Sequence, residues 1–256
     1  PSNSYIYLYG NMDMEEKLNW LDQEYLSAYD RKEVDSEIHL QKPFEQMHDI
    51  TKPYSIASNE STEDNTYLSY NKVIGTSLDE KLYLAFQILD YALLSAPGAP
   101  ITKALLEAGI GKDISGSYDS STYQPIFSIV AKNANEEQKA EFVKVIEDTL
   151  KAIVENGMDK KALEAGINYH EFRYREADFG GYPKGLMYGL QIFDSWLYDE
   201  TKPFIHVEAL DTFAFLKEQI NTGYFEKLIQ TYLLDNQHGA LVTICLLYTS
   251  PSPRDS

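Results

Sequence analysis

The stretch that decides the fold class is PIFSIVAKNANEEQKAEFVKVIEDTLKAIVENG, residues 125–157. It opens with an apolar, β-branched run, which predicts a strand over residues 125–132. Phe142, Ile146 and Leu150 then recur at helical spacing, which predicts an amphipathic helix over residues 135–155 with one buried face. Asn156-Gly157 supplies the stop signal of that helix. A strand followed directly by a long helix indicates a mixed domain in which a sheet and a helix share one core.

Further strands and helices are predicted on both sides of this stretch. Strands are expected at residues 66–74, 113–121 and 238–244, the second of them paired with 125–132. Helices are expected from Ser77, with Glu80 completing a capping box, and at 101–108, 159–177, 184–197, 208–221 and 224–234. Because the strands and helices do not alternate as regular βαβ units, the order favours an α+β fold over a doubly wound α/β fold.

The two ends of the chain differ from its middle. Residues 4–9 are rich in Tyr, Ile and Leu and predict a strand, and Asp13 is expected to cap a helix whose Leu18, Leu21 and Tyr25 form a buried face. Residues 30–53 are charged and polar with no sustained period, which predicts a linker. Residues 245–256 resemble a translated transposase sequencing adapter, so the native part is expected to be residues 1–244.

The charge balance bounds the class of partner. The chain has 256 residues, with 22 Lys+Arg against 40 Asp+Glu and a formal net charge of −18. Nucleic-acid binding and attachment to an anionic membrane are not expected, because both need a basic surface. A cationic peptide fits an acidic protein, although a surplus of acid that serves only solubility explains the charge equally well.

Catalytic motifs are absent from the sequence. His170-Glu171 begins like the zinc motif H-E-x-x-H, but Tyr174 stands where the second histidine is needed. The inverted motif H-x-x-E-H occurs at none of the five histidines, and the one cysteine lies in the tail. We therefore expect no catalytic and no metal-binding residue. Arg175 and Tyr182, beside a Gly-Gly-Tyr-Pro break, are the candidate peptide contacts, while an exposed, ion-paired helix end is the ordinary interpretation of that charge cluster.

Several segments together resemble the presequence-protease branch of the pitrilysin/insulinase zinc metallopeptidases. They are Pro1 to Gly10, Thr66-Tyr67-Leu68-Ser69, Leu89-Asp90-Tyr91, Pro97-Gly98-Ala99-Pro100-Ile101, Ala108-Gly109-Ile110-Gly111-Lys112-Asp113, Asn168-Tyr169, Glu171-Phe172 and Arg175 to Leu186. The resemblance implies a clam-shell of four homologous α+β domains around a closed chamber, each a two-layer domain with an antiparallel-rich sheet packed by helices on one face. In that family the first domain carries H-x-x-E-H and a distal Glu, which hold zinc.

The resemblance also implies a place for each part of this chain. Residues 1–29 would be the last strand and helix of the first domain, 30–53 a crossover, and 54–244 a second, non-catalytic domain. The parent would be a zinc metalloendopeptidase that degrades unfolded oligopeptides, and this segment, which should bind no zinc itself, would be part of the chamber wall. Expected partners are the other domains of the same chain and unstructured, basic peptides.

Two other interpretations stay open. The parent could be a catalytically inactive homologue that acts as a scaffold or peptide-binding subunit, or the chain could be an unrelated α+β binding domain. The expected compartment is the cytoplasm in a bacterium, and the mitochondrion or another organelle in a eukaryote.

Overall fold

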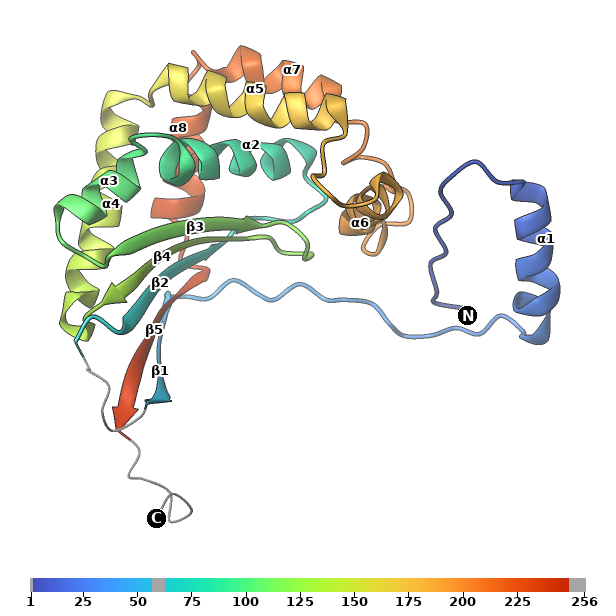
Figure 1. Cartoon of the computed structure of the whole chain (residues 1–256), viewed down its shortest axis with the longest axis horizontal. Helices are drawn as coiled ribbons and strands as arrows, with labels where there is room; N and C mark the ends of the chain where they lie inside the picture. Colours follow the sequence, from blue (N-terminus) through green and yellow to red (C-terminus); the bar gives the residue numbers. More distant parts are fainter. Residues whose placement is uncertain (1, 57–62, 249–256) are drawn as a thin grey trace.

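A mixed five-stranded sheet forms one layer of the protein (Figure 1). The computed structural model describes residues 2–56 and 63–248. Within these residues the strand order is β1-β5-β2-β4-β3, with β1 parallel to β5 and every other neighbouring pair antiparallel. The strands are β1 (His48–Ile56), β2 (Thr66–Val73), β3 (Asp113–Asp119), β4 (Ile126–Ala134) and β5 (Gly239–Tyr248). The α+β fold with an antiparallel-rich sheet is confirmed.

Helices cover one face of this sheet, and α2 lies between the sheet and the outer helices α5 and α7 (Figure 1). The helices are α2 (Glu80–Asp90), which continues as the π-helical turn η2 (Tyr91–Ser95), α3 (Pro100–Glu107), α4 (Lys139–Asn156), α5 (Lys160–Glu176), α6 (Lys184–Trp196), α7 (Leu210–Gln219) and α8 (Tyr224–Ile229). Seven of the eleven residues of α2 are buried. A helix with apolar residues on most of its circumference belongs inside a domain, which explains its central position.

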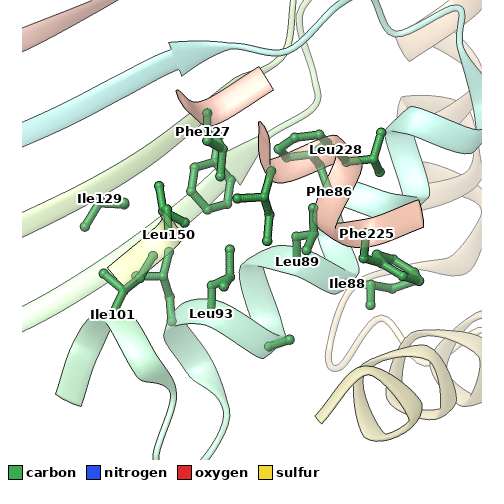
Figure 2. Close-up of a cluster of buried hydrophobic side chains, with 14 of the residues drawn as sticks. Phe86, Ile88, Leu89, Leu93, Ile101, Phe127, Ile129, Leu150, Phe225 and Leu228 are labelled. Carbon is green, nitrogen blue, oxygen red and sulfur yellow. The ribbon is translucent and has the colours of Figure 1, made fainter. Parts of the chain in front are cut away.

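The core fills the space between the sheet and the helices. Alternate residues of β2 and β4 point into it, among them Tyr70, Phe127 and Ile129, because successive side chains of a strand face opposite sides. Figure 2 shows Phe127 beside Phe86 of α2, with Ile129, Leu93 of η2 and side chains of α3, α4 and α8 in the same buried cluster. The sequence-predicted inward residues of α4, Phe142, Ile146 and Leu150, are all buried as expected.

Capping explains where the helices begin, with one correction. Asp159 caps α5 as predicted, accepting a hydrogen bond from the Lys161 amide. The predicted capping box at Ser77 and Glu80 is wrong: Asp79 is the cap of α2, and its carboxylate accepts from the amide of Leu82. With Asp79 as the N-cap, Glu80 is the first helical residue and the third is Leu82, whose apolar side chain cannot complete a capping box.

The N-terminal segment differs most from the sequence expectation. Helix α1 (Met14–Glu24) forms with Asp13 as its cap, but none of its residues is buried, and Leu18 is 59% exposed. Figure 1 shows why: α1 lies away from the sheet, beyond an extended segment. Residues 4–9 pair with no strand in the described part of the chain. The predicted buried face of α1 and the predicted strand are therefore both corrected.

Two strands also extend beyond their expected limits. Strand β1 lies partly within residues 30–53, where the sequence predicts no element. Its Pro53 is tolerated because an edge strand can lose one backbone donor. Strand β5 runs through Ile244 to Tyr248, and residues 249–256 of the adapter-like tail lie outside the described residues. The division of the chain at residues 29, 53 and 244 stays a prediction. Among the described residues, no helix is long and apolar enough to cross a membrane.

Candidate functional site

The two sequence-predicted peptide contacts lie close together in the sequence, Arg175 in the last turn of α5 and Tyr182 in the loop between α5 and α6. Ala177 ends that helix in the left-handed conformation, which turns the chain toward α6. The Arg175 side chain is 55% exposed and Tyr182 is 67% exposed. They line separate hollows, Arg175 beside Val207 and Tyr182 beside Phe172. The structure therefore does not bring them into one cleft, and peptide contact by either residue stays a prediction.

Arg175 is engaged in an ion-pair network that joins α5 to α7. Its Nη2 and Nε atoms lie 2.7 and 3.0 Å from Oε1 of Glu171. The second oxygen of Glu171 pairs with the ammonium of Lys217 on α7. Lys217 first, and then Arg175, lower the pKa of this nearly buried carboxyl, which stays ionised at neutral pH. The network fixes the end of α5 against α7.

The same ion-pair network makes a zinc site at His170 unsuitable, because it engages the residue next to it. Its neighbour Glu171 already holds two cations, and one turn further on the side chain is Tyr174, whose hydroxyl bonds the backbone carbonyl of Val207. This donor set does not fit a zinc site. Across the described residues, no three His, Cys, Asp or Glu side chains gather closely enough to hold a metal ion.

His170 instead faces a cavity of about 320 Å³. The walls come from α2, α5, α6, α7 and the end of β3, with His206 contributed by the segment before α7. Burial lowers the pKa of His170 to about 4, so its imidazole is neutral at physiological pH. The residues that give the cavity its chemistry are Tyr83, Asp90, Tyr118, His170, His206 and Phe213.

Three polar atoms on these walls have no hydrogen-bond partner: Oδ1 of Asp90, the hydroxyl of Tyr118 and Nε2 of His206. His206 is only 6% exposed, and its ring stacks on Tyr83 with centroids 3.7 Å apart. Burial raises the pKa of Asp90 to about 6 and lowers that of His206 to about 4. Buried polar atoms without partners are uncommon in folded proteins, so three on one cavity mark it as the candidate site.

A second notable surface lies on α6. Tyr7 packs where a side chain at Gly189 would stand, since a Cβ there would be 2.9 Å from its ring, and Tyr9 covers Gly185 in the same way. Tyr5 meets Trp196 edge-on at 4.9 Å. Two glycines four residues apart leave a groove on one side of a helix, and here the groove receives alternate tyrosines of the N-terminal segment.

Sequence reasoning missed both features. Asp90, Tyr118 and His206 are far apart in the sequence and belong to no motif, so nothing in the sequence alone groups them. The glycines did carry a signal: Gly185 and Gly189 are spaced to lie on one helix face, and Tyr5, Tyr7 and Tyr9 alternate as a strand's side chains do. That pairing could have been proposed.

Comparison with known proteins gives consistent matches. A family model described as "Peptidase M16 inactive domain" matches residues 1–169. The chain is 47% identical over 244 residues to Protein HypA of Clostridium perfringens, covering 95% of this chain and 25% of that protein. It is 32% identical over 250 residues to presequence protease 1, chloroplastic/mitochondrial, of Arabidopsis thaliana, covering 94% of this chain and 23% of that protein. The chain thus spans about a quarter of the length of these relatives.

A solved structure supports the fold. A conserved protein from Enterococcus faecalis V583 superposes with a TM-score of 0.67 at 13% identity, over 94% of this chain and 51% of that one. At this identity the likeness bears on the fold alone. It agrees with the layered α+β architecture described above.

Proposed function

Since this chain belongs to the peptidase M16 family, as its inactive domain, we propose that it is the non-catalytic chamber wall of a zinc-dependent metalloendopeptidase that degrades unfolded oligopeptides. The family match carries this proposal. It is supported by the relative in Arabidopsis thaliana that is named a presequence protease, of which the chain covers about a quarter. The zinc and the catalytic residues would belong to another part of the parent.

The α6 groove suggests how the wall is attached. Tyr5, Tyr7 and Tyr9 face α6, while Ile6, on the opposite side of the same extended segment, is 39% exposed. An extended segment with side chains on two sides can join two bodies, one on each side. We assign the exposed side to the neighbouring, catalytic domain of the same polypeptide, so that the tyrosines hold this domain against it.

The acidic charge of the chain suggests the kind of substrate. A net charge of −18 creates a negative field, which attracts and concentrates cationic chains. Basic, unstructured peptides are therefore the proposed substrate class of the parent, with Arg175 and Tyr182 as candidate contacts. The compartment would be the cytoplasm in a bacterial source and the mitochondrion or another organelle in a eukaryotic one.

The experiment compares the 256-residue chain with the full reading frame that contains it. Each protein is dialysed, its zinc content is measured by mass spectrometry, and hydrolysis of a quenched fluorescent, unstructured peptide is followed. We expect hydrolysis and zinc in the full protein, abolished by a chelator, and neither in the chain alone. Stoichiometric zinc retained by the chain alone would refute the proposal. A full protein that binds peptide without hydrolysing it would indicate the inactive scaffold instead.

The charge component is tested separately, by fluorescence anisotropy with a lysine-rich and a glutamate-rich peptide of equal length. We expect the full protein to prefer the lysine-rich peptide, and added salt to weaken that preference. Equal binding of the two peptides would show that the excess of acidic residues serves solubility and does not select the substrate.

A further inference from the structure

Helix α6 is apolar on most of its circumference, yet one of its sides is exposed. Its inner side is buried, and the N-terminal tyrosines lie over Gly185 and Gly189 on the next side. The exposed side, here called the α6 stripe, consists of Leu186, Leu190 and Leu197, each between 43% and 53% exposed. Spacings of four and seven residues place them in one row along the helix. A helix of this composition is normally buried all round, so the row points to a further contact.

Helix α1 carries a second exposed apolar row. Its members recur at spacings of three and four residues, so they share one side of the helix, and they are here called the α1 stripe: Met14, Leu18, Leu21 and Tyr25 at the C-cap. None of them is buried. A helix of eleven residues is marginal in water unless its apolar side packs against something. The α1 stripe therefore also needs a surface to cover it.

The two stripes match each other in length and form. The α1 stripe extends from residue 14 to 25 and the α6 stripe from residue 186 to 197, so both are about 16 Å long at 1.5 Å per residue. Two helices pack when the side-chain rows of one fit between those of the other. Two straight apolar rows of equal length satisfy this condition along their whole extent.

Within one copy of the chain the two stripes do not cover each other. Helix α1 lies on the far side of the N-terminal segment from α6 (Figure 1). Residues 10–13 join it to Tyr9, which lies over Gly185 of α6. Helix α1 is therefore tethered beside α6, next to a contact that already exists, while both stripes stay open to another molecule.

The size of the stripes favours an arrangement that uses both of them. A stable interface needs about 800 Å² from each partner. At roughly 60–120 Å² of apolar surface for each leucine, the α6 stripe supplies at most about 350 Å², so contact between two α6 helices alone is too small. If α1 of each copy lies on α6 of the other, each copy contributes both stripes. Such a two-fold contact closes at two copies.

We propose that the α1 and α6 stripes are the docking surface for a second copy of this chain, with α1 of each copy lying along the α6 stripe of the other. The contact is reciprocal, so the same two stripes are buried twice in the dimer. This inference does not rest on the proposed peptidase function, because it concerns only the two helices of this chain.

The charge of the chain sets how the association responds to salt. Each copy has a formal net charge of −18, so two copies repel each other at long range. Salt screens that repulsion and leaves the apolar contact in place, so added salt should strengthen the dimer. Binding of a cationic peptide should respond to salt in the opposite way, which separates a failure of this proposal from a failure of the proposed function.

The test is sedimentation velocity of the 256-residue chain over a range of about 5–200 μM, where contacts of micromolar affinity are measured. We expect monomers at the lowest concentration, a discrete dimer at the highest, and a larger dimer fraction in about 0.5 M salt than in about 0.1 M.

Variants assign the dimer to the two stripes. Leu18→Lys and Leu190→Glu should each weaken self-association by about tenfold or more, because each places a charge in both copies of the contact. Mixing the two variants should restore the dimer, since the lysine of one copy then meets the glutamate of the other while the second contact stays apolar. The matched control is Leu106→Glu, at a leucine of α3 that is 47% exposed, and it should leave the association unchanged.

Several results would overturn the assignment. A monomer at every concentration would mean that the stripes are covered within one copy or by a different protein. A dimer that Leu190→Glu abolishes but Leu18→Lys leaves intact would indicate contact between two α6 helices. Open-ended aggregation, or a mixture of the two variants that stays monomeric, would exclude the reciprocal contact. Circular dichroism establishes that each variant is folded before its association is measured.

Discussion

Replacing Asp90 by Asn should stabilise the protein at neutral pH. Burial raises the pKa of this carboxyl from 3.8 to about 6. A folded-state pKa that is raised in this way favours the protonated form, so the cost of the carboxylate builds up as the pH rises from 3.8 to about 6 and is complete above that. At 1.36 kcal/mol for each pH unit, the full cost is about 3 kcal/mol. The asparagine amide keeps some of that cost because it is also unsatisfied, so the expected gain is about 1–3 kcal/mol.

The assay is urea denaturation of the wild type and Asp90→Asn at pH 7.5 and pH 5. The lower pH stays above the pI of about 4.6, where the protein would be least soluble. At pH 5 the linkage relation leaves about half of the carboxylate cost, so the gain should shrink by about 1.4 kcal/mol. Asp22→Asn, at an exposed position of α1, should stay within about 0.5 kcal/mol of the wild type.

The reasoning is refuted if Asp90→Asn is no more stable than the wild type at pH 7.5, or if its gain is the same at both pH values. The first result would mean that Asp90 is solvated or paired. The second would mean that the gain comes from packing rather than from the charge.

Three further predictions concern stability measured by urea denaturation. Asp79→Ala should lower the free energy of unfolding by about 1 kcal/mol because it removes the cap of α2, whereas Ser77→Ala should leave the stability unchanged. A larger loss in Ser77→Ala than in Asp79→Ala would support the capping box of Ser77 and Glu80 instead. Gly239→Ala should lower the free energy of unfolding by about 1–3 kcal/mol, because the new Cβ would overlap the Asn71 carbonyl oxygen. An unchanged urea midpoint would show that β5 can shift away from β2 without loss of stability. Glu171→Gln should cost about 1 kcal/mol at pH 7, and the difference should disappear as the pH falls through the lowered pKa of Glu171; a difference that persists in acid would exclude the ion pairs as its cause.

The layered part of the fold could be predicted from the sequence because each signal there was local. Helix α4 shows it well: apolar residues at helical spacing, a polar start and a terminal glycine all lie within one stretch. Strand β1 could not be found in this way. Its residues His48–Ile56 include lysine and proline, and it exists because β5 offers an edge to pair with. The predicted buried face of α1 was wrong for the opposite reason: its apolar pattern is strong, but no surface in the described part of the chain covers it.

The candidate site was largely hidden from sequence reasoning. Arg175 could be singled out by its charge cluster, and the structure shows Arg175 to be ion-paired with Glu171. The cavity residues Asp90, Tyr118 and His206 stand out only by lacking partners in three dimensions, and a sequence does not record which polar atoms go unsatisfied. Their separation along the chain also removes any spacing rule.

The pairing of β1 with β5 has a consequence for how the protein is made. His48 pairs with Ala240, so one side of the sheet joins residues nearly the whole domain apart. The chain loses the entropy of closing this long loop before the stabilising contacts between β1 and β5 form, so such long-range pairing slows folding. As the chain leaves the ribosome, β1 emerges long before β5, so this edge stays open until β5 has been synthesised. An open edge invites pairing with other chains. We therefore expect a chain shortened before residue 239 to aggregate during synthesis even though its central helix and the β2–β4–β3 strands are intact.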